Sequence, residues 1–148
     1  MPDATPAPAR PAHLGWRLLA MVYDAMPVIA LWFAVSALVL AIRPGHEPFA
    51  PWSPGQLLLW ALCWAVSGAY AVVSWRRAGT LGMRPWRLRV TDAEGRPAGT
   101  RALCARYAVA TLSLAAFGLG FLWSLFDRER RTWHDLASGT RLLRLPPR

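Results

Sequence analysis

The chain has 148 residues and a net charge of +9, and 55% of its residues are hydrophobic. This apolar content exceeds that of an average soluble domain, and so short a chain has no core large enough to hide the surplus. The composition excludes a disordered or fibrous chain and a secreted disulfide scaffold, and it argues against a soluble enzyme. The positive charge does not indicate a nucleic-acid partner, because the sequence has no zinc-finger or RNA-binding motif.

The first segment, residues 1–13, is rich in proline and alanine and has little to bury, so we expect a disordered tail. An apolar stretch follows from about residue 16 to residue 42, with no charge after residue 24. At ~1.5 Å per residue this stretch is long enough to span a bilayer as a helix. The loop 43–55 has one arginine and four prolines, as expected of a short loop on the non-cytoplasmic side.

A second apolar stretch at about 56–75 predicts another spanning helix, which ends at two arginines. The following stretch, 76–106, contains eight arginines and two acidic residues, and its RLRV sequence at 87–90 alternates like a short strand. A third uncharged run covers 107–126 and contains Gly118 and Gly120, where we expect a weak point or close packing. In the tail, TRLLRL at 140–145 predicts a second strand.

Arginine counts place the N-terminus and the 76–106 stretch in the cytoplasm and the first loop outside. The third run leaves two alternatives. If it crosses fully, the six arginines between Arg128 and Arg148 lie outside, against the charge rule. If it breaks at the glycines and re-enters, the tail stays cytoplasmic and TRLLRL is able to pair with RLRV. The predicted fold is an all-α membrane protein with two spanning helices, a third full or re-entrant hydrophobic helix, and a minor cytoplasmic β element.

Asp24 is the most informative residue because an ionised carboxylate inside a spanning helix costs at least a few kcal/mol. Arg17 lies on the same helix face about 10 Å away, and Tyr23 is near this polar strip. Pro27 frees the carbonyl oxygen of Tyr23 beside the carboxylate. Two interpretations follow: Asp24 binds a cation or proton, or it pairs with an arginine such as Arg106 and locks the helices together.

Later residues add candidates to this polar network. Arg106 is either an interfacial side chain or the counter-ion of Asp24 or Asp135. Asp135 is expected in a cap or salt bridge, because no nucleophile accompanies the adjacent His134. The turn of Gly79, Thr80 and Gly82 lacks the lysine of a phosphate-binding loop, and neither cysteine belongs to a metal-binding motif. The sequence therefore predicts no enzyme, no cofactor and no metal.

Four segments in order resemble the RDD family of small bacterial integral membrane proteins. GWRLLAMVYD carries the family's first arginine and aspartate, Arg17 and Asp24. The block from Trp75 through AGTLGM and RVTDAEG matches its middle element, and Leu103–Arg106 matches the motif that opens its next helix. The final motif matches His134, Asp135, Gly139 and Thr140. On this resemblance, residues 14–145 form an RDD-like membrane domain, and 146–148 a short tail.

The resemblance implies a multi-pass protein of the inner membrane without a cofactor, with transport as its suggested role. We expect translocation of a cation or proton at Asp24, with Arg17 and Arg106 tuning its pKa and Asp135 organising the cytoplasmic mouth. A homo-oligomer is expected because three short helices enclose little space. The alternative is a non-transporting adaptor or assembly protein whose arginine-rich face binds anionic lipid headgroups or a protein partner.

Overall fold

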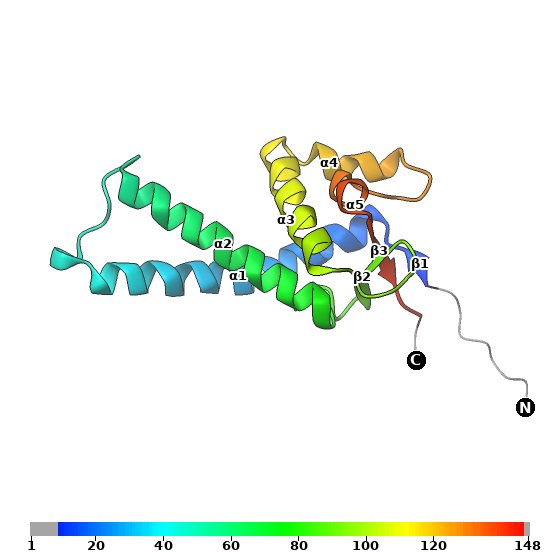
Figure 1. The fold of residues 1–148 in the computed structure, drawn as a ribbon, viewed down its shortest axis with the longest axis horizontal. Helices are drawn as coiled ribbons and strands as arrows, with labels where there is room; N and C mark the ends of the chain where they lie inside the picture. The colour runs from blue at the N-terminus through cyan, green and yellow to red at the C-terminus, as the bar shows by residue number, and fades with distance from the viewer. Residues whose placement is uncertain (1–8, 147–148) are drawn as a thin grey trace, which may run out of the picture.

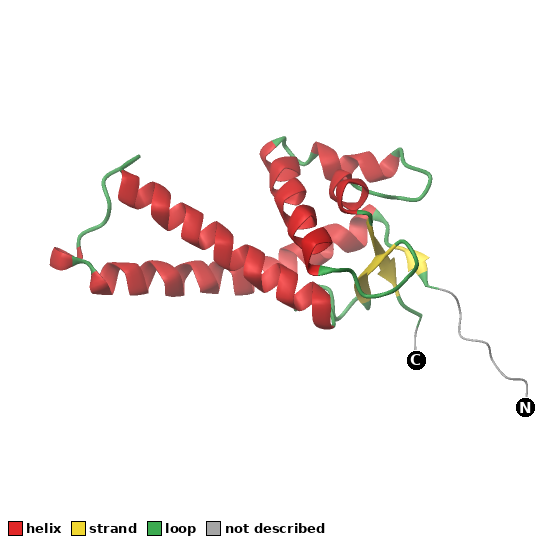
Figure 2. Cartoon of the chain, in the orientation of Figure 1, coloured by secondary structure: helices red, strands yellow, loops and turns green. Residues whose placement is uncertain are grey.

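Two long antiparallel helices dominate the computed structural model, which describes residues 9–146 (Figures 1 and 2). Helix α1 covers Leu14–Ile42 and helix α2 covers Pro54–Arg77, with a short 3-10 turn, η1, at Pro44–His46 between them. The helices diverge toward this loop, and a small sheet lies at their other end, close to both ends of the described chain (Figure 1). We call these two ends of the hairpin the loop end and the sheet end.

Both helices have the length and apolar composition of membrane spans, which confirms the two predicted helices of spanning length. Helix α1 continues through Pro27 without a break. Helix α2 begins at a cap in which the Gln56 N–H donates to Ser53 Oγ at 3.3 Å. Its last turn carries Arg76 and Arg77, as favoured at a helix C-terminus.

The third hydrophobic run is bent and does not form one straight helix. Helix α3, Thr100–Ala115, is followed by the short helix α4, Leu119–Leu122, and the 3-10 turn η2, Trp123–Leu125, at an angle of 108°. Phe117 and Gly118 adopt left-handed backbone angles with φ of 54° and 77°, which ends α3. A Cβ on Gly120 would lie 2.4 Å from Ser113 Oγ, so this glycine permits close packing. The predicted break is confirmed at Gly118, whereas Gly120 lies within α4.

The chain then returns to the sheet end. Helix α5, Trp133–Ser138, leads into strand β3, Thr140–Arg144, which pairs antiparallel with β2, Leu88–Asp92, so that Val90 lies opposite Leu142. The predicted pairing of the RLRV and TRLLRL segments is therefore confirmed.

The N-terminal tail differs in part from the expectation of disorder over residues 1–13. Strand β1, Arg10–Pro11, pairs with β3 and completes a sheet of order β1-β3-β2. Ala12 is 1% exposed and its N–H donates to Leu142 O at 2.9 Å. The expectation is wrong for residues 10–13, because the open edge of β3 supplies backbone partners that composition does not reveal. Residues 1–8, and residues 147–148 of the predicted C-terminal tail, lie outside the described part.

The hydrophobic core lies at the sheet end, not between the spanning helices. None of the most apolar 18-residue window of α1 is buried by protein, and only 17% of that of α2. The apolar faces of the hairpin therefore require lipid as their solvent. The core is formed by small and aliphatic side chains from β2, β3, α1, α3 and the segments that connect the elements: Ala12, Ala20, Met83, Leu88, Val90, Ala98, Leu103 and Leu142.

The pairing of β1 with β3 predicts that both termini lie on the same side of the membrane. Fusions of one topology reporter to the N-terminus and, separately, to the C-terminus are expected to give the same signal, and insertion of the reporter after Gly45 in the loop the opposite one. Opposite signals from the two termini would contradict the fold.

Candidate functional site

A buried carboxylate, that of Asp135, lies at the centre of the sheet end. Asp135 is 1% exposed and occupies the first turn of α5. Its Oδ2 accepts a hydrogen bond from the Thr132 N–H at 3.0 Å, while the Asp135 N–H donates to Thr132 Oγ1 at 3.4 Å. This reciprocal cap fixes the start of the helix and the position of the carboxylate together.

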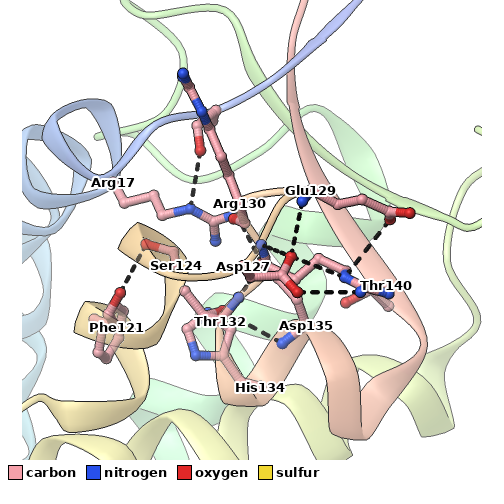
Figure 3. Close-up of polar contacts among 12 residues, drawn as sticks. Arg17, Phe121, Ser124, Asp127, Glu129, Arg130, Thr132, His134, Asp135 and Thr140 are labelled. Atoms are coloured by element: carbon pink, nitrogen blue, oxygen red, sulfur yellow. Dashed lines mark hydrogen bonds and ion pairs between the residues drawn. The ribbon is translucent and has the colours of Figure 1, made fainter.

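Two arginines from different helices pair with this carboxylate, and Figure 3 shows Arg17, Thr132 and Thr140 around Asp135. Arg17 of α1 contacts Asp135 Oδ2 through Nη2 at 2.7 Å, and Arg106 of α3 contacts Oδ1 through Nη1. The two guanidinium side chains are each 4% exposed. We call this group, Arg17, Arg106 and Asp135, the Arg–Asp–Arg cluster. It connects α1, α3 and α5 through one buried charge.

Further contacts hold the two arginines in place. Arg17 Nε donates to Ala12 O at 3.2 Å, and its Nη2 donates to Arg130 O at 3.1 Å. Arg106 Nη1 also donates to Thr140 Oγ1 at 2.7 Å, at the start of β3. The cluster therefore reaches the sheet through β3 as well as through the residue that follows β1.

The cluster carries an excess positive charge, because one carboxylate faces two guanidinium groups. Burial by itself raises the pKa of Asp135, but the positive charges of Arg106 and Arg17 outweigh it and hold the pKa well below its usual range. Asp135 consequently stays ionised, and its contribution to stability persists until strongly acidic pH.

His134 is a buried neutral side chain beside the cluster. It is 4% exposed, and its ring packs against Phe121 with a centroid separation of 4.8 Å. Burial and the nearby charge of Arg106 lower the pKa of His134 from 6.5 to about 3. The imidazole is therefore uncharged at neutral pH, and its Nδ1 has no hydrogen-bond partner in the described protein.

Asp24 forms a second, separate cluster on α1. Its Oδ1 accepts hydrogen bonds from Tyr70 Oη at 3.0 Å and from the Gly82 N–H at 2.8 Å, and its Oδ2 accepts one from the Thr80 hydroxyl. A Cβ on Gly82 would lie 2.1 Å from Ala20 O, so only glycine allows the turn to approach α1 this closely. Asp24 thus fastens the 79–82 turn to α1, and among the described residues it has no ion pair.

The structure divides the predicted polar network into these two clusters. It brings Arg17, Arg106 and Asp135 together and places Asp24 with the predicted turn residues Thr80 and Gly82. Arg106 therefore has Asp135, and not Asp24, as its counter-ion.

Two further predicted residues take different positions. Tyr23 is 52% exposed and meets Trp86 edge-on, outside both clusters. Gly79 has a φ of 88° and shapes the turn.

Sequence reasoning missed two residues of the clusters. Thr132 lies three residues before Asp135, a spacing typical of a capping box, so a local signal for its role exists. Tyr70 is a polar side chain in an apolar helix, but nothing in the sequence assigns its hydroxyl to Asp24.

A cavity of about 870 Å³ connects the two clusters with the membrane-facing part of the hairpin. Its walls are mostly apolar and come from α1, α2 and α3. Arg17, Arg106, His134 and Asp24 line the part nearer the sheet, and residues such as Ser36 and Leu59 line the part nearer the loop end.

Comparison with known proteins gives one family. The model of the RDD family matches residues 11–139, which include both clusters and both spanning helices. No curated protein and no solved structure matches the chain.

Asp135→Asn is expected to destabilise the protein by about 3–5 kcal/mol, because it leaves two buried guanidinium groups without their counter-ion. Chemical unfolding in detergent, followed by tryptophan fluorescence, measures this loss. Glu94→Gln is the control: it removes an exposed partner of Arg96 and should cost less than about 1 kcal/mol. Equal effects of the two substitutions would contradict the cluster.

Acidification is expected to destabilise the protein through His134. Because its pKa is about 3 when folded and 6.5 when unfolded, protons bind the unfolded state preferentially between these values. The stabilisation is complete above pH 6.5 and declines as pH falls, by about 3 kcal/mol at pH 4.5. His134→Gln should remove this part of the pH dependence, whereas His46→Gln in the exposed loop should leave it unchanged. An identical pH profile for His134→Gln and wild type would refute the assignment.

Proposed function

The chain belongs to the RDD family of small membrane proteins, and we propose that it binds an amphiphilic molecule in the cavity between α1, α2 and α3. The observation that carries this proposal is the cavity itself. Its volume of about 870 Å³ lies in the range of about 300–1,000 Å³ that small-molecule sites occupy. A single chain forms it without a second copy.

The distribution of polarity in the walls supports an amphiphile as the ligand. The apolar side chains of the walls come from helices that would otherwise contact lipid. An alkyl chain therefore packs favourably against them. At the sheet end the walls change to charged side chains, which suit a polar head. We infer a binding role, because these walls offer an apolar environment to an alkyl chain and charged side chains to a polar head.

The arginine distribution supports an orientation for this site. The 76–106 stretch has eight arginines and the loop end has one, so we propose a multi-pass inner-membrane protein with the sheet end and both termini in the cytoplasm. The cavity would then receive its ligand from the cytoplasmic leaflet. Exposed arginines at the sheet end, such as Arg76, Arg77 and Arg101, would bind anionic lipid headgroups there.

Cation or proton transport at Asp24 is a second candidate, favoured by the fact that Asp24 lines the cavity. Its carboxylate already accepts hydrogen bonds from three donors, out of about four acceptor positions. The Gly82 N–H is a fixed donor that a cation would face unfavourably. This geometry suits a structural contact between α1 and the 79–82 turn better than a cation site. Ion flux in proteoliposomes that is the same for Asp24→Asn and wild type would exclude transport at Asp24.

Two tryptophan substitutions on α3 test the amphiphile proposal. Ala110 lines the cavity, whereas Ala108 is exposed and outside it. The purified protein is irradiated with a dodecanol that carries a photoreactive diazirine, and labelled peptides are mapped by mass spectrometry. Labelling in wild type is expected at cavity residues such as Cys63 and Ala71.

Filling the cavity should separate the two variants. Ala110→Trp should reduce cavity labelling at least about fivefold, since the side chain occupies the ligand's space, while Ala108→Trp should retain it. Labelling confined to the outward faces of the hairpin, or equal labelling in both variants, would overturn the proposal.

A further inference from the structure

We infer that the amphiphile carries an anionic head, a carboxylate or a phosphate, which binds the Arg–Asp–Arg cluster at the sheet end of the cavity. This inference rests on the proposed function and names the class of its ligand. A free fatty acid and an anionic phospholipid both have this chemistry.

The first argument is the charge of the cluster. Arg17 and Arg106 share the single carboxylate of Asp135, so the buried group has a net charge of +1. Asp24, an acidic residue in the cavity wall, does not neutralise this charge, because it lies seven residues, about 10 Å, farther along α1 than Arg17 and is engaged by three donors. A buried charge without a counter-ion is unfavourable, and an anion at this place would neutralise it.

The second argument is a set of nitrogen atoms that lack partners. Arg17 Nη1, Arg106 Nε and His134 Nδ1 are buried and make no hydrogen bond within the described protein. The three residues are only 4%, 3% and 4% exposed, and all three line the cavity. Buried polar groups are nearly always paired, and unpaired ones point to a missing partner.

An anion satisfies these nitrogens better than water does. Guanidinium N–H groups match the geometry of carboxylate and phosphate oxygens, and neutral imidazole offers one N–H as well. A carboxylate or phosphate supplies acceptors and the missing negative charge together. With its head here, the alkyl chain has the apolar walls toward Ser36 and Leu59 available.

Binding to the wild-type protein in a neutral detergent tests the inference with three probes. Dodecanoate and dodecanol share an alkyl chain and differ in charge, and acetate supplies the head without the chain. We expect dodecanoate to bind about tenfold more tightly than dodecanol by calorimetry, which corresponds to one charge-assisted hydrogen bond. Acetate should show no binding at the same concentrations.

Each other result has a defined meaning. Equal binding of dodecanoate and dodecanol overturns the anionic head but keeps the amphiphile. Equal binding of acetate and dodecanoate supports an anion site and overturns the amphiphile. No binding of any probe overturns both. Competition by phosphatidylglycerol but not phosphatidylcholine against dodecanoate would assign the site to a phospholipid, and failure of both to compete would assign it to a fatty acid.

Two conservative substitutions on α3 locate the anion. Arg106→Lys keeps the charge but loses the unpartnered Nε, whereas Arg101→Lys changes an exposed arginine on the same helix. Arg106→Lys should weaken dodecanoate binding about tenfold without changing dodecanol binding, and Arg101→Lys should change neither. Equal loss of both ligands in Arg106→Lys would show a merely structural role. If this variant does not fold, the comparison of dodecanoate, dodecanol and acetate on the wild-type protein still tests the anionic head.

Discussion

The ion pairs of Asp135 with Arg17 and Arg106 connect three helices that lie far apart in the sequence. Arg17 belongs to α1, Arg106 to α3, and Asp135 to α5, the short helix before the last strand. An isolated charge in such a buried place is too costly to persist, so each helix requires the other two in position. The sheet end is thus organised by charge, while the hairpin beyond it depends on lipid.

Asp24 has a comparable structural role without a counter-charge. Hydrogen bonds from Tyr70, Thr80 and Gly82 satisfy its carboxylate and bring α2 and the 79–82 turn onto α1. The two acidic residues therefore fasten different segments to the same helix. Between them the cavity remains, with cationic and hydrogen-bonding groups at one end and apolar walls elsewhere. This asymmetry, more than any single residue, supports an anionic amphiphile as the ligand.

Local and periodic features of the sequence predicted much of the fold. The uncharged runs predicted the two spanning helices, and the alternation of apolar and polar residues predicted β2 and β3. Gly118 indicated the bend in the third run, which composition alone predicts to be one straight helix. The partners of the charged residues were harder to predict. Helical periodicity shows on which face of the helix Arg17 lies, but not which distant residue pairs with it. Strand β1 was not predicted, because a strand of two residues, one of them a proline, shows no periodicity, and only the edge of β3 supplies its partners.

The central claim is that Asp135 neutralises two buried arginines jointly. A double-mutant cycle that combines Asp135→Asn with Arg106→Gln measures this coupling directly, through the free energy of unfolding in detergent. The account predicts that the double variant is more stable than Asp135→Asn alone, because removing one guanidinium relieves an unpaired buried charge. Losses of stability that simply add would contradict it.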